Sequence, residues 1–186
     1  MTDAAYLTGQ LLLAMPGMGD PRFEHAVIAM CVHDAQGALG IDLSRVHPEL
    51  SFRDLLANLD IEPGAAPDRP VHIGGPVEPH RGFVLHSPEW ADPGTLPVST
   101  CFALSPSLAV LRAIAAGRGP QHWLFALGYA GWGEGQLDGE LTRHGWSATA
   151  ASEAIVFAAP AEARWAAAWK VQGIDPALLA STTGRA

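Results

Sequence analysis

The segment from Gly74 to His86 holds the residue types best suited to binding an anion. Gly74 and Gly75 have no side chains, so their backbone N–H groups could approach a ligand closely, and Arg81 follows in the same segment. Backbone amides beside a guanidinium suit a carboxylate or a phosphate. The alternative is a tight loop in which Arg81 pairs with a nearby carboxylate on the surface.

A second glycine-dense segment runs from Gly128 to Glu140 and carries Tyr129, Trp132 and Gln136. A dinucleotide fingerprint needs glycines at its first, third and sixth positions, but counting from Gly131 the sixth position is Gln136. The spacing therefore excludes that motif. The alternative is structural, because glycines provide positive φ angles and let neighbouring aromatic rings pack closely.

Nucleophiles and metal ligands show no known arrangement. Strand alternation would place Cys31 and His33 on one side and Asp34 on the other. Two ligands do not make a metal site, and the other histidines lack paired spacing. No serine occupies a GxSxG turn, and Cys31 and Cys101 are expected to be buried, reduced thiols. The sequence predicts no catalytic residue, no metal and no cofactor.

Composition limits the classes of partner that the protein is expected to bind. The 186 residues include 11 Lys and Arg against 19 Asp and Glu, a formal net charge of −8. A polyanion needs a basic face, so direct binding to nucleic acid is disfavoured. Apolar runs fall short of the roughly 20 residues of a membrane span, and the start Met1-Thr2-Asp3 does not resemble a signal peptide. We therefore expect a cytoplasmic protein with no membrane partner.

Periodicity and turn residues predict the elements that must position these segments. Ser51 should cap a helix that reaches Leu59, and Ser105 a helix that stops at Gly117. An Ala-rich helix at 161–172 should bury Trp165 and Trp169 on one face. Further elements are predicted as strands at 9–15, 23–32, 38–43, 71–73, 82–86, 123–127 and 154–157, and a short helix at 137–144. The order lacks a βαβ repeat and predicts one α+β domain over 1–186.

Five sequence blocks follow one another along almost the whole chain. They are LLAMPGM (12–18) with DPRF (20–23), VIAMCVH (27–33), GGPV (74–77), RGFVLH (81–86), and GYAGW (128–132) with GQL (135–137). In these blocks the chain resembles the bacterial YqgE/AlgH family. The resemblance implies an α+β domain whose mostly antiparallel, bent sheet forms a barrel-like core with flanking helices.

The resemblance implies no established activity, although the family carries the label of transcriptional regulator. One segment departs from the family pattern. Where the family usually has Gly-Leu-Val-Ile-Asn-Arg-Pro, this chain has Gly-Ile-Asp-Leu-Ser-Arg-Val at 40–46. Ser44 keeps a hydrogen-bonding side chain, whereas Val46 replaces the rigid proline.

We expect a non-enzymatic binding or regulatory protein that engages a protein or a small anionic ligand. The residues expected to line its groove are Gly74, Gly75, Arg81, His86, Tyr129, Trp132, Gln136 and Glu140. One alternative is a hydrolase-like enzyme that uses Glu140, His86 or Cys31 in a pocket assembled by the fold. The other is a transcriptional regulator, which the acidic composition disfavours as a direct DNA binder.

Overall fold

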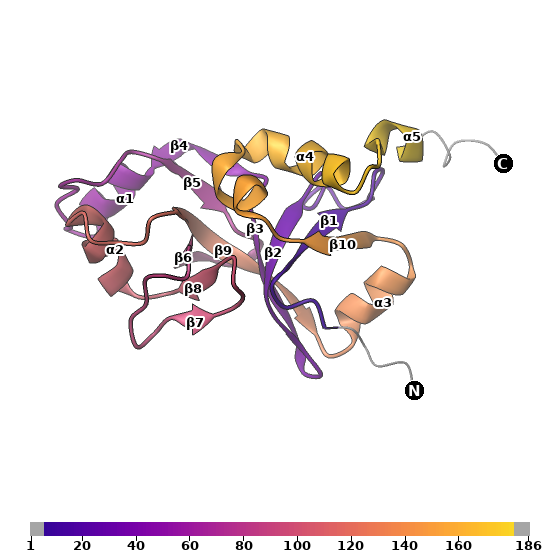
Figure 1. Ribbon diagram of the computed structural model, residues 1–186, viewed down its shortest axis with the longest axis horizontal. Helices are drawn as coiled ribbons and strands as arrows, with labels where there is room; N and C mark the ends of the chain where they lie inside the picture. Colours follow the sequence, from indigo (N-terminus) through magenta and orange to yellow (C-terminus); the bar gives the residue numbers. More distant parts are fainter. Residues whose placement is uncertain (1–5, 181–186) are drawn as a thin grey trace.

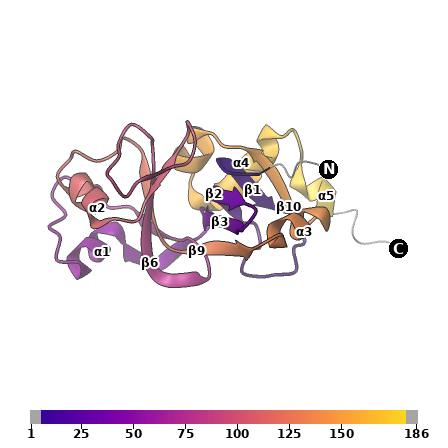
Figure 2. The same cartoon turned by 90° about the horizontal axis from the view of Figure 1, so that it is seen from below.

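The fold is α+β, with a mostly antiparallel sheet curled into a half-barrel and flanked by helices (Figures 1 and 2). The computed structural model describes residues 6–180, so the predicted unit 1–186 extends beyond the described residues at both ends. The main strand order is β10-β1-β2-β3-β9-β6-β8-β7. The strands are β1 (Gln10–Ala14), β2 (Val27–Asp34), β3 (Gly37–Asp42), β4 (Val46–Ser51), β5 (Pro70–Ile73), β6 (Val77–His86), β7 (Leu96–Pro97), β8 (Ala103–Ser105), β9 (Trp123–Gly133) and β10 (Trp146–Ala150).

Strand β9 connects the two halves of the molecule seen in Figure 1. Its C-terminal part pairs antiparallel with β3, in a register that sets Leu39 opposite Gly131. Its N-terminal part lies between β6, which is antiparallel, and β5, which is parallel. The predicted hairpin of β2 and β3 is confirmed. β9 is longer than predicted, because the glycine-rich segment after Leu127 continues the strand instead of leaving the sheet.

Three glycines allow the chain to pass over β9 between β5, on one side of it, and β6, on the other. A Cβ on Gly74 would lie 2.2 Å from the Gly128 carbonyl oxygen, and one on Gly75 would lie 2.1 Å from the Tyr129 carbonyl carbon. Gly128 has a φ of +75°, which disfavours any side chain there. The Gly74 N–H donates to the Leu127 carbonyl at 2.8 Å. The sheet therefore uses the Gly74 amide that the sequence analysis assigned to an anion.

The two helices of the first half differ in how well their starts were predicted. α1 (Phe52–Asn58) is capped by Ser51 as expected, and the Asp54 carboxylate accepts a hydrogen bond from the Ser51 N–H at 3.0 Å. α2 (Leu108–Ala115) begins after Ser107, so the predicted cap at Ser105 is wrong. Ser105 instead ends β8, opposite Val84 of β6, where strand pairing fixes its backbone.

Several elements differ from those predicted, mainly in the C-terminal part. β10 and β4 were not predicted as strands, and the strand predicted at 154–157 is a π-helical turn, η1 (Ala154–Ala158). Adjacent Ile155 and Val156 are both buried, which strand alternation would not allow on a one-sided sheet. The other elements are α3 (Gln136–Thr142), the 3₁₀ turn η2 (Ala161–Ala163), α4 (Arg164–Val171) and α5 (Pro176–Ala180).

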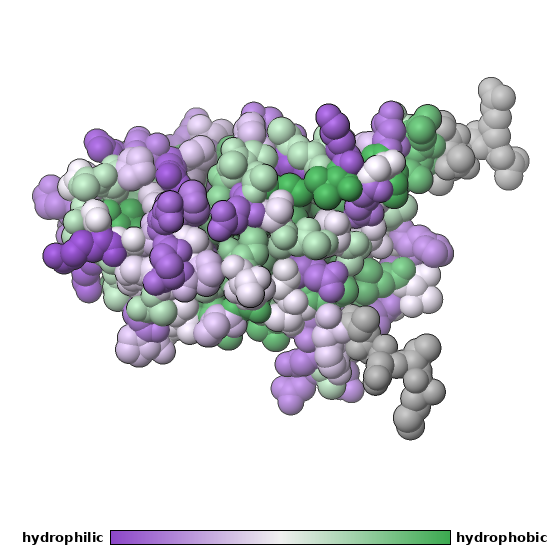
Figure 3. All heavy atoms as spheres, viewed as in Figure 1, coloured by the Kyte–Doolittle hydropathy of each residue, from purple (hydrophilic) through white to green (hydrophobic). Residues whose placement is uncertain are grey.

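The tryptophan face of α4 covers β1 and β2. Trp169 is 1% exposed, and the Trp165 indole N–H donates to the Ala14 carbonyl at 2.8 Å, so the predicted burial of this face is confirmed. Apolar side chains gather on the surface around α4 and α5 in Figure 3, where Val171 is exposed. Within residues 6–180, no helix is long and apolar enough to cross a membrane.

Candidate functional site

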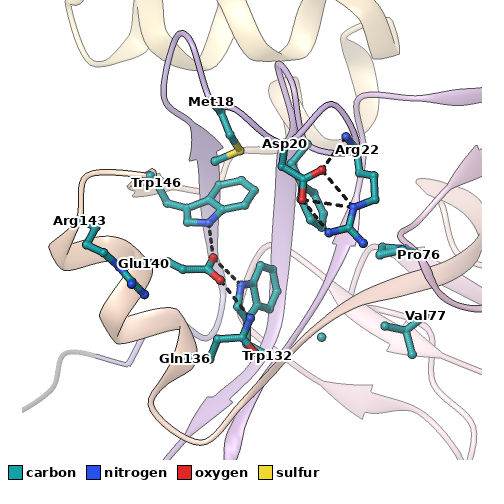
Figure 4. A pocket seen from close by; sticks show the side chains of 13 residues that line it. Met18, Asp20, Arg22, Pro76, Val77, Trp132, Gln136, Glu140, Arg143 and Trp146 are labelled. Carbon is teal, nitrogen blue, oxygen red and sulfur yellow. Dashed lines mark hydrogen bonds and ion pairs between the residues drawn. The ribbon is translucent and has the colours of Figure 1, made fainter. Parts of the chain in front are cut away.

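Two tryptophans from neighbouring parts of the fold share one carboxylate. Trp132 of β9 donates its indole N–H to Glu140 Oε2 at 3.0 Å, and Trp146 of β10 donates to the same oxygen at 2.8 Å (Figure 4). Glu140 Oε1 accepts from the Gln136 amide at 3.0 Å. Gln136 and Glu140 lie one turn apart on α3, so the helix presents both side chains to the same place. This cluster fixes the orientation of both indole rings.

The clustered side chains form one wall of a pocket of about 440 Å³. The opposite side comes from the β1–β2 loop and from the beginning of β6 (Figure 4). The lining residues are Met18, Asp20, Arg22, Phe23, Pro76, Val77, Gly131, Trp132, Gln136, Glu140, Arg143, Gly145 and Trp146. The pocket thus combines aromatic walls with a few charged groups, the usual composition of a small-molecule site.

Besides Glu140, the pocket has three charged side chains, Asp20, Arg22 and Arg143. Arg22 and Asp20 form a two-pronged ion pair, with Nε 3.0 Å from Oδ1 and Nη2 2.7 Å from Oδ2. The hydrogen bonds from Arg22 hold the pKa of Asp20 below its usual value. Arg143 donates through Nε to the Gly139 carbonyl at 3.1 Å. Among the described residues, its two terminal nitrogens have no acceptor.

The comparisons with known proteins agree with the five sequence blocks described above and with the fold. A family model described as DUF179: AlgH-like matches residues 11–177. The chain belongs to the AlgH-like family. The UPF0301 proteins of Novosphingobium aromaticivorans and Rhizorhabdus wittichii are each 58% identical to this AlgH-like chain over 186 residues, covering 100% of both sequences.

Solved structures also resemble this AlgH-like chain. The solution structure of the AlgH protein from Pseudomonas aeruginosa has a TM-score of 0.77 and 39% identity, covering 100% of this chain and 97% of that one. The crystal structure of DIP2367 from Corynebacterium diphtheriae has a TM-score of 0.76 and 18% identity, covering 94% and 91% of the two chains, and shows the fold alone. The predicted family and fold class are therefore confirmed. The names of these relatives state no reaction.

The pocket unites only part of the predicted AlgH-like groove. Trp132, Gln136 and Glu140 line it together. Tyr129 lines a neighbouring hollow that shares Trp132, and it packs edge-on against Phe83. The glycine pair at 74–75 lies between β5 and β6, where the chain passes over β9. The second predicted segment thus contributes Gly131, Trp132, Gln136 and Glu140 to the lining, and the first contributes only Pro76 and Val77 from near its start.

The structure does not bring Arg81 to the pocket. Its Nη1 lies 3.1 Å from Glu78 Oε2 in an exposed ion pair, and its guanidinium lies over the Phe83 ring at 5.2 Å. Glu78, three residues away on the same strand, reaches Arg81 because its φ of +45° breaks the regular alternation of β6. This is the surface pairing that the sequence analysis held as the alternative.

His86 is buried away from the pocket. Its Nδ1 faces the Ser87 carbonyl at 2.9 Å, and its Nε2 lies 2.8 Å from the Ser105 hydroxyl. A carbonyl can only accept, so Nδ1 carries the hydrogen, and Nε2 of the neutral ring accepts from Ser105. Burial lowers the pKa of His86. Both His86 and Ser105 are 0% exposed, so this serine and histidine pair cannot meet a substrate.

Cys31 is also buried and unreactive. Its side chain is 1% exposed in the core beneath β2, and burial raises the pKa of the thiol to about 12. Only the thiolate is an effective nucleophile, so Cys31 is inert at neutral pH. Within residues 6–180, no group of three or more His, Cys, Asp or Glu side chains is placed to hold a metal ion.

Several pocket residues were missed by sequence reasoning. Trp146 lies in a segment to which no helix or strand was assigned, and Arg143 lies in the short helix predicted at 137–144. Asp20, Arg22 and Phe23 belong to one of the blocks that carry the family resemblance, which was the available signal. What the sequence could not indicate is that β10 returns beside β1 and places Trp146 against Glu140.

Proposed function

We propose that this protein is a non-enzymatic binding protein that takes a small anionic ligand in the Trp132–Trp146 pocket. The observation that carries the proposal is the pairing of a fixed aromatic wall with Arg143, whose terminal nitrogens have no acceptor within residues 6–180. Asp20 already pairs with Arg22 through Nε and Nη2 and balances its charge. An anionic group would therefore find its free hydrogen-bond donors at Arg143.

The size and the walls of the pocket support a small molecule. A volume of about 440 Å³ lies within the range of roughly 300–1,000 Å³ that is typical of ligand sites. Trp132 and Trp146 are 7% and 5% exposed, and their N–H groups are already bonded to Glu140. The small parts of these rings that line the pocket are the surface available to an apolar or aromatic ligand body.

The positions of the acids and nucleophiles support binding without chemistry. Glu140 receives three hydrogen bonds from Trp132, Trp146 and Gln136, which makes it a structural acceptor in the pocket wall. Cys31 and His86 are buried elsewhere. A regulatory role would then be exercised through the ligand or through a protein partner, in the cytoplasm where the sequence analysis expects the chain to reside.

A pair of matched aromatic probes tests the proposal. 2-Naphthoate and 2-naphthamide have the same ring system, but only the first carries a negative charge. We expect 2-naphthoate to shift the indole N–H resonances of Trp132 and Trp146 in a ¹⁵N NMR titration, and 2-naphthamide to bind more weakly. Arg143→Gln should weaken 2-naphthoate about fivefold, the effect of about 1 kcal/mol for an accessible ion pair, and leave 2-naphthamide unchanged.

Arg118→Gln is the matched control, because Arg118 is exposed and lies outside this pocket. It should leave the binding of both probes as in the wild type. Equal binding of charged and neutral probes would contradict the anionic part of the proposal. Resonance shifts that avoid both indoles at every probe concentration would contradict the assignment of the pocket.

A further inference from the structure

Arg164, the first residue of α4, is a buried cation. Its side chain is 4% exposed, and its guanidinium reaches into the region between β5, β9 and η1. Nε donates to the Ile155 carbonyl at 3.0 Å, and Nη1 donates to the Leu43 carbonyl at 2.6 Å. Nη1 also lies 2.8 Å from Nε2 of His72. All three of these acceptors are neutral groups.

No carboxylate of the described residues lies within 4 Å of the Arg164 nitrogens. Asp42 and Glu162 act on Arg164 only through space. Burial lowers the pKa of Arg164 to about 10, so the guanidinium remains charged at neutral pH. A buried charge without a contacting counter-ion is strongly unfavourable, and proteins normally pair such a group. The described side chains therefore leave the Arg164 charge without a counter-ion in contact with it.

The imidazole of His72, next to Arg164, also has a buried donor without an acceptor. Because Arg164 donates to Nε2 of His72, Nδ1 of the neutral ring must carry the hydrogen. Nδ1 is buried and, within residues 6–180, has no hydrogen-bond partner of good geometry. Burial and the charge of Arg164 lower the pKa of His72 to about 4, which keeps the ring neutral at physiological pH. His72 thus orients Arg164 without contributing a competing positive charge.

A cavity of about 440 Å³ opens beside these two residues. Arg69 also lines it, with its guanidinium carbon 4.5 Å from the centre of the Trp123 ring and Nη1 donating to the Trp123 carbonyl at 2.7 Å. Within the described part of the chain, Nη2 of Arg164 and both Nε and Nη2 of Arg69 have no acceptor.

We propose that this cavity is an oxyanion-binding site, in which Arg164 and Arg69 hold a phosphate or carboxylate group between them. The ligand would supply the acceptors that the described protein groups lack, and the apolar ring of Trp123 would flank its organic part. Two guanidinium groups offer planar, paired donors that match both kinds of oxyanion. The site is separate from the Trp132–Trp146 pocket and shares no lining residue with it.

Inorganic phosphate is the first probe, and acetate at equal ionic strength is the second. In an NMR titration that follows arginine side-chain N–H resonances at pH 7.5, we expect saturable shifts at Arg164 and Arg69. A Kd of about 1 mM or tighter is expected for the better of the two anions. Phosphate binding alone would identify a phosphate site, acetate binding alone a carboxylate site, and either result supports an oxyanion site.

Arg69→Gln should weaken binding of the preferred anion at least fivefold, since Arg69 is only partly buried and its loss leaves the core intact. Arg164→Lys keeps the charge but removes the paired donors, and it should weaken binding similarly; if that variant does not fold, Arg69→Gln alone decides. Arg112→Gln, an exposed change on α2, is the control and should bind normally. The proposal is overturned if neither anion saturates, or if all three variants bind alike. Arg143→Gln should leave this site unaffected, which separates it from the proposed function.

Discussion

The indole N–H of Trp146 lies 2.8 Å from Glu140 Oε2, and this contact joins β10 to α3. Trp132 of β9 donates to the same oxygen, so one carboxylate holds three elements together. Hydrogen bonds to a charged acceptor contribute about 1.5–3 kcal/mol each, more than bonds between neutral groups. Glu140 therefore sets both the local stability and the shape of the pocket.

Replacing Glu140 by Gln should lower the free energy of unfolding by about 1–3 kcal/mol, because the charge is lost and the amide has one acceptor oxygen in place of two. With that oxygen facing the two indoles, the amide nitrogen would face the Gln136 Nε2 donor. Urea denaturation measures the loss, and near-UV circular dichroism should report the loosened indoles. Glu134→Gln is the control, since Glu134 is exposed at the turn before α3. An unchanged denaturation midpoint for Glu140→Gln would show that the cluster contributes no stability.

Asp42 should make the protein more stable on mild acidification. Burial raises the pKa of Asp42 from 3.8 to about 6, so between these values the folded state binds a proton that the unfolded state lacks. This contribution to stability is complete below about pH 3.8 and is lost as the pH rises through about 6. From pH 7 to pH 5 the wild type should gain roughly 1 kcal/mol relative to Asp42→Asn. Urea denaturation of both proteins at the two pH values is the measurement, and parallel pH profiles would refute the assignment.

His72 should make the protein less stable on acidification. Burial lowers the pKa of His72 from 6.5 to about 4, so the unfolded state takes up a proton before the folded state does. Its contribution to stability is present above about pH 6.5 and is lost as the pH falls through about 4. Relative to His72→Gln, the wild type should lose roughly 1–2 kcal/mol between pH 7.5 and pH 5. Glutamine preserves an acceptor for Arg164 but does not titrate. A steeper acid dependence in His72→Gln would contradict this prediction.

The two cysteines should differ in reactivity towards a thiol reagent. Cys101 is partly exposed, whereas Cys31 is buried with a thiol pKa of about 12. We expect 5,5′-dithiobis(2-nitrobenzoate) to modify one thiol in the native protein and two after unfolding. In Cys101→Ser, reaction should require unfolding. Fast modification of Cys31 in the folded state would reopen the alternative of a cysteine-dependent enzyme.

Duplex DNA should not bind in a salt-sensitive manner. With 19 acidic against 11 basic side chains, the chain has little charge with which to displace counter-ions from a phosphate backbone. Fluorescence anisotropy with a labelled duplex at low and moderate salt tests this, with a known basic DNA-binding domain as the positive control. Sub-micromolar binding that weakens steeply with added salt would favour a regulator that contacts DNA directly.

The sequence by itself determined the features that depend on neighbouring residues. The helix start at Ser51, the hairpin of β2 and β3 and the buried face of Trp169 follow from side-chain capping, turn residues and helical spacing. The family blocks likewise indicated the α+β fold class. Trp132, Gln136 and Glu140 were recognised as candidates because they lie close together in one segment.

Only the tertiary structure decided which of these residues meet. β10 pairs with β1 across some 135 residues of chain, and this pairing brings Trp146 to Glu140. Local preferences were overruled for the same reason at 154–157, where burial of adjacent Ile155 and Val156 favours a helical turn over a strand. Arg164 reaches His72 over a separation of 92 residues. Such contacts depend on strand pairing and core packing, which no local spacing in the sequence encodes.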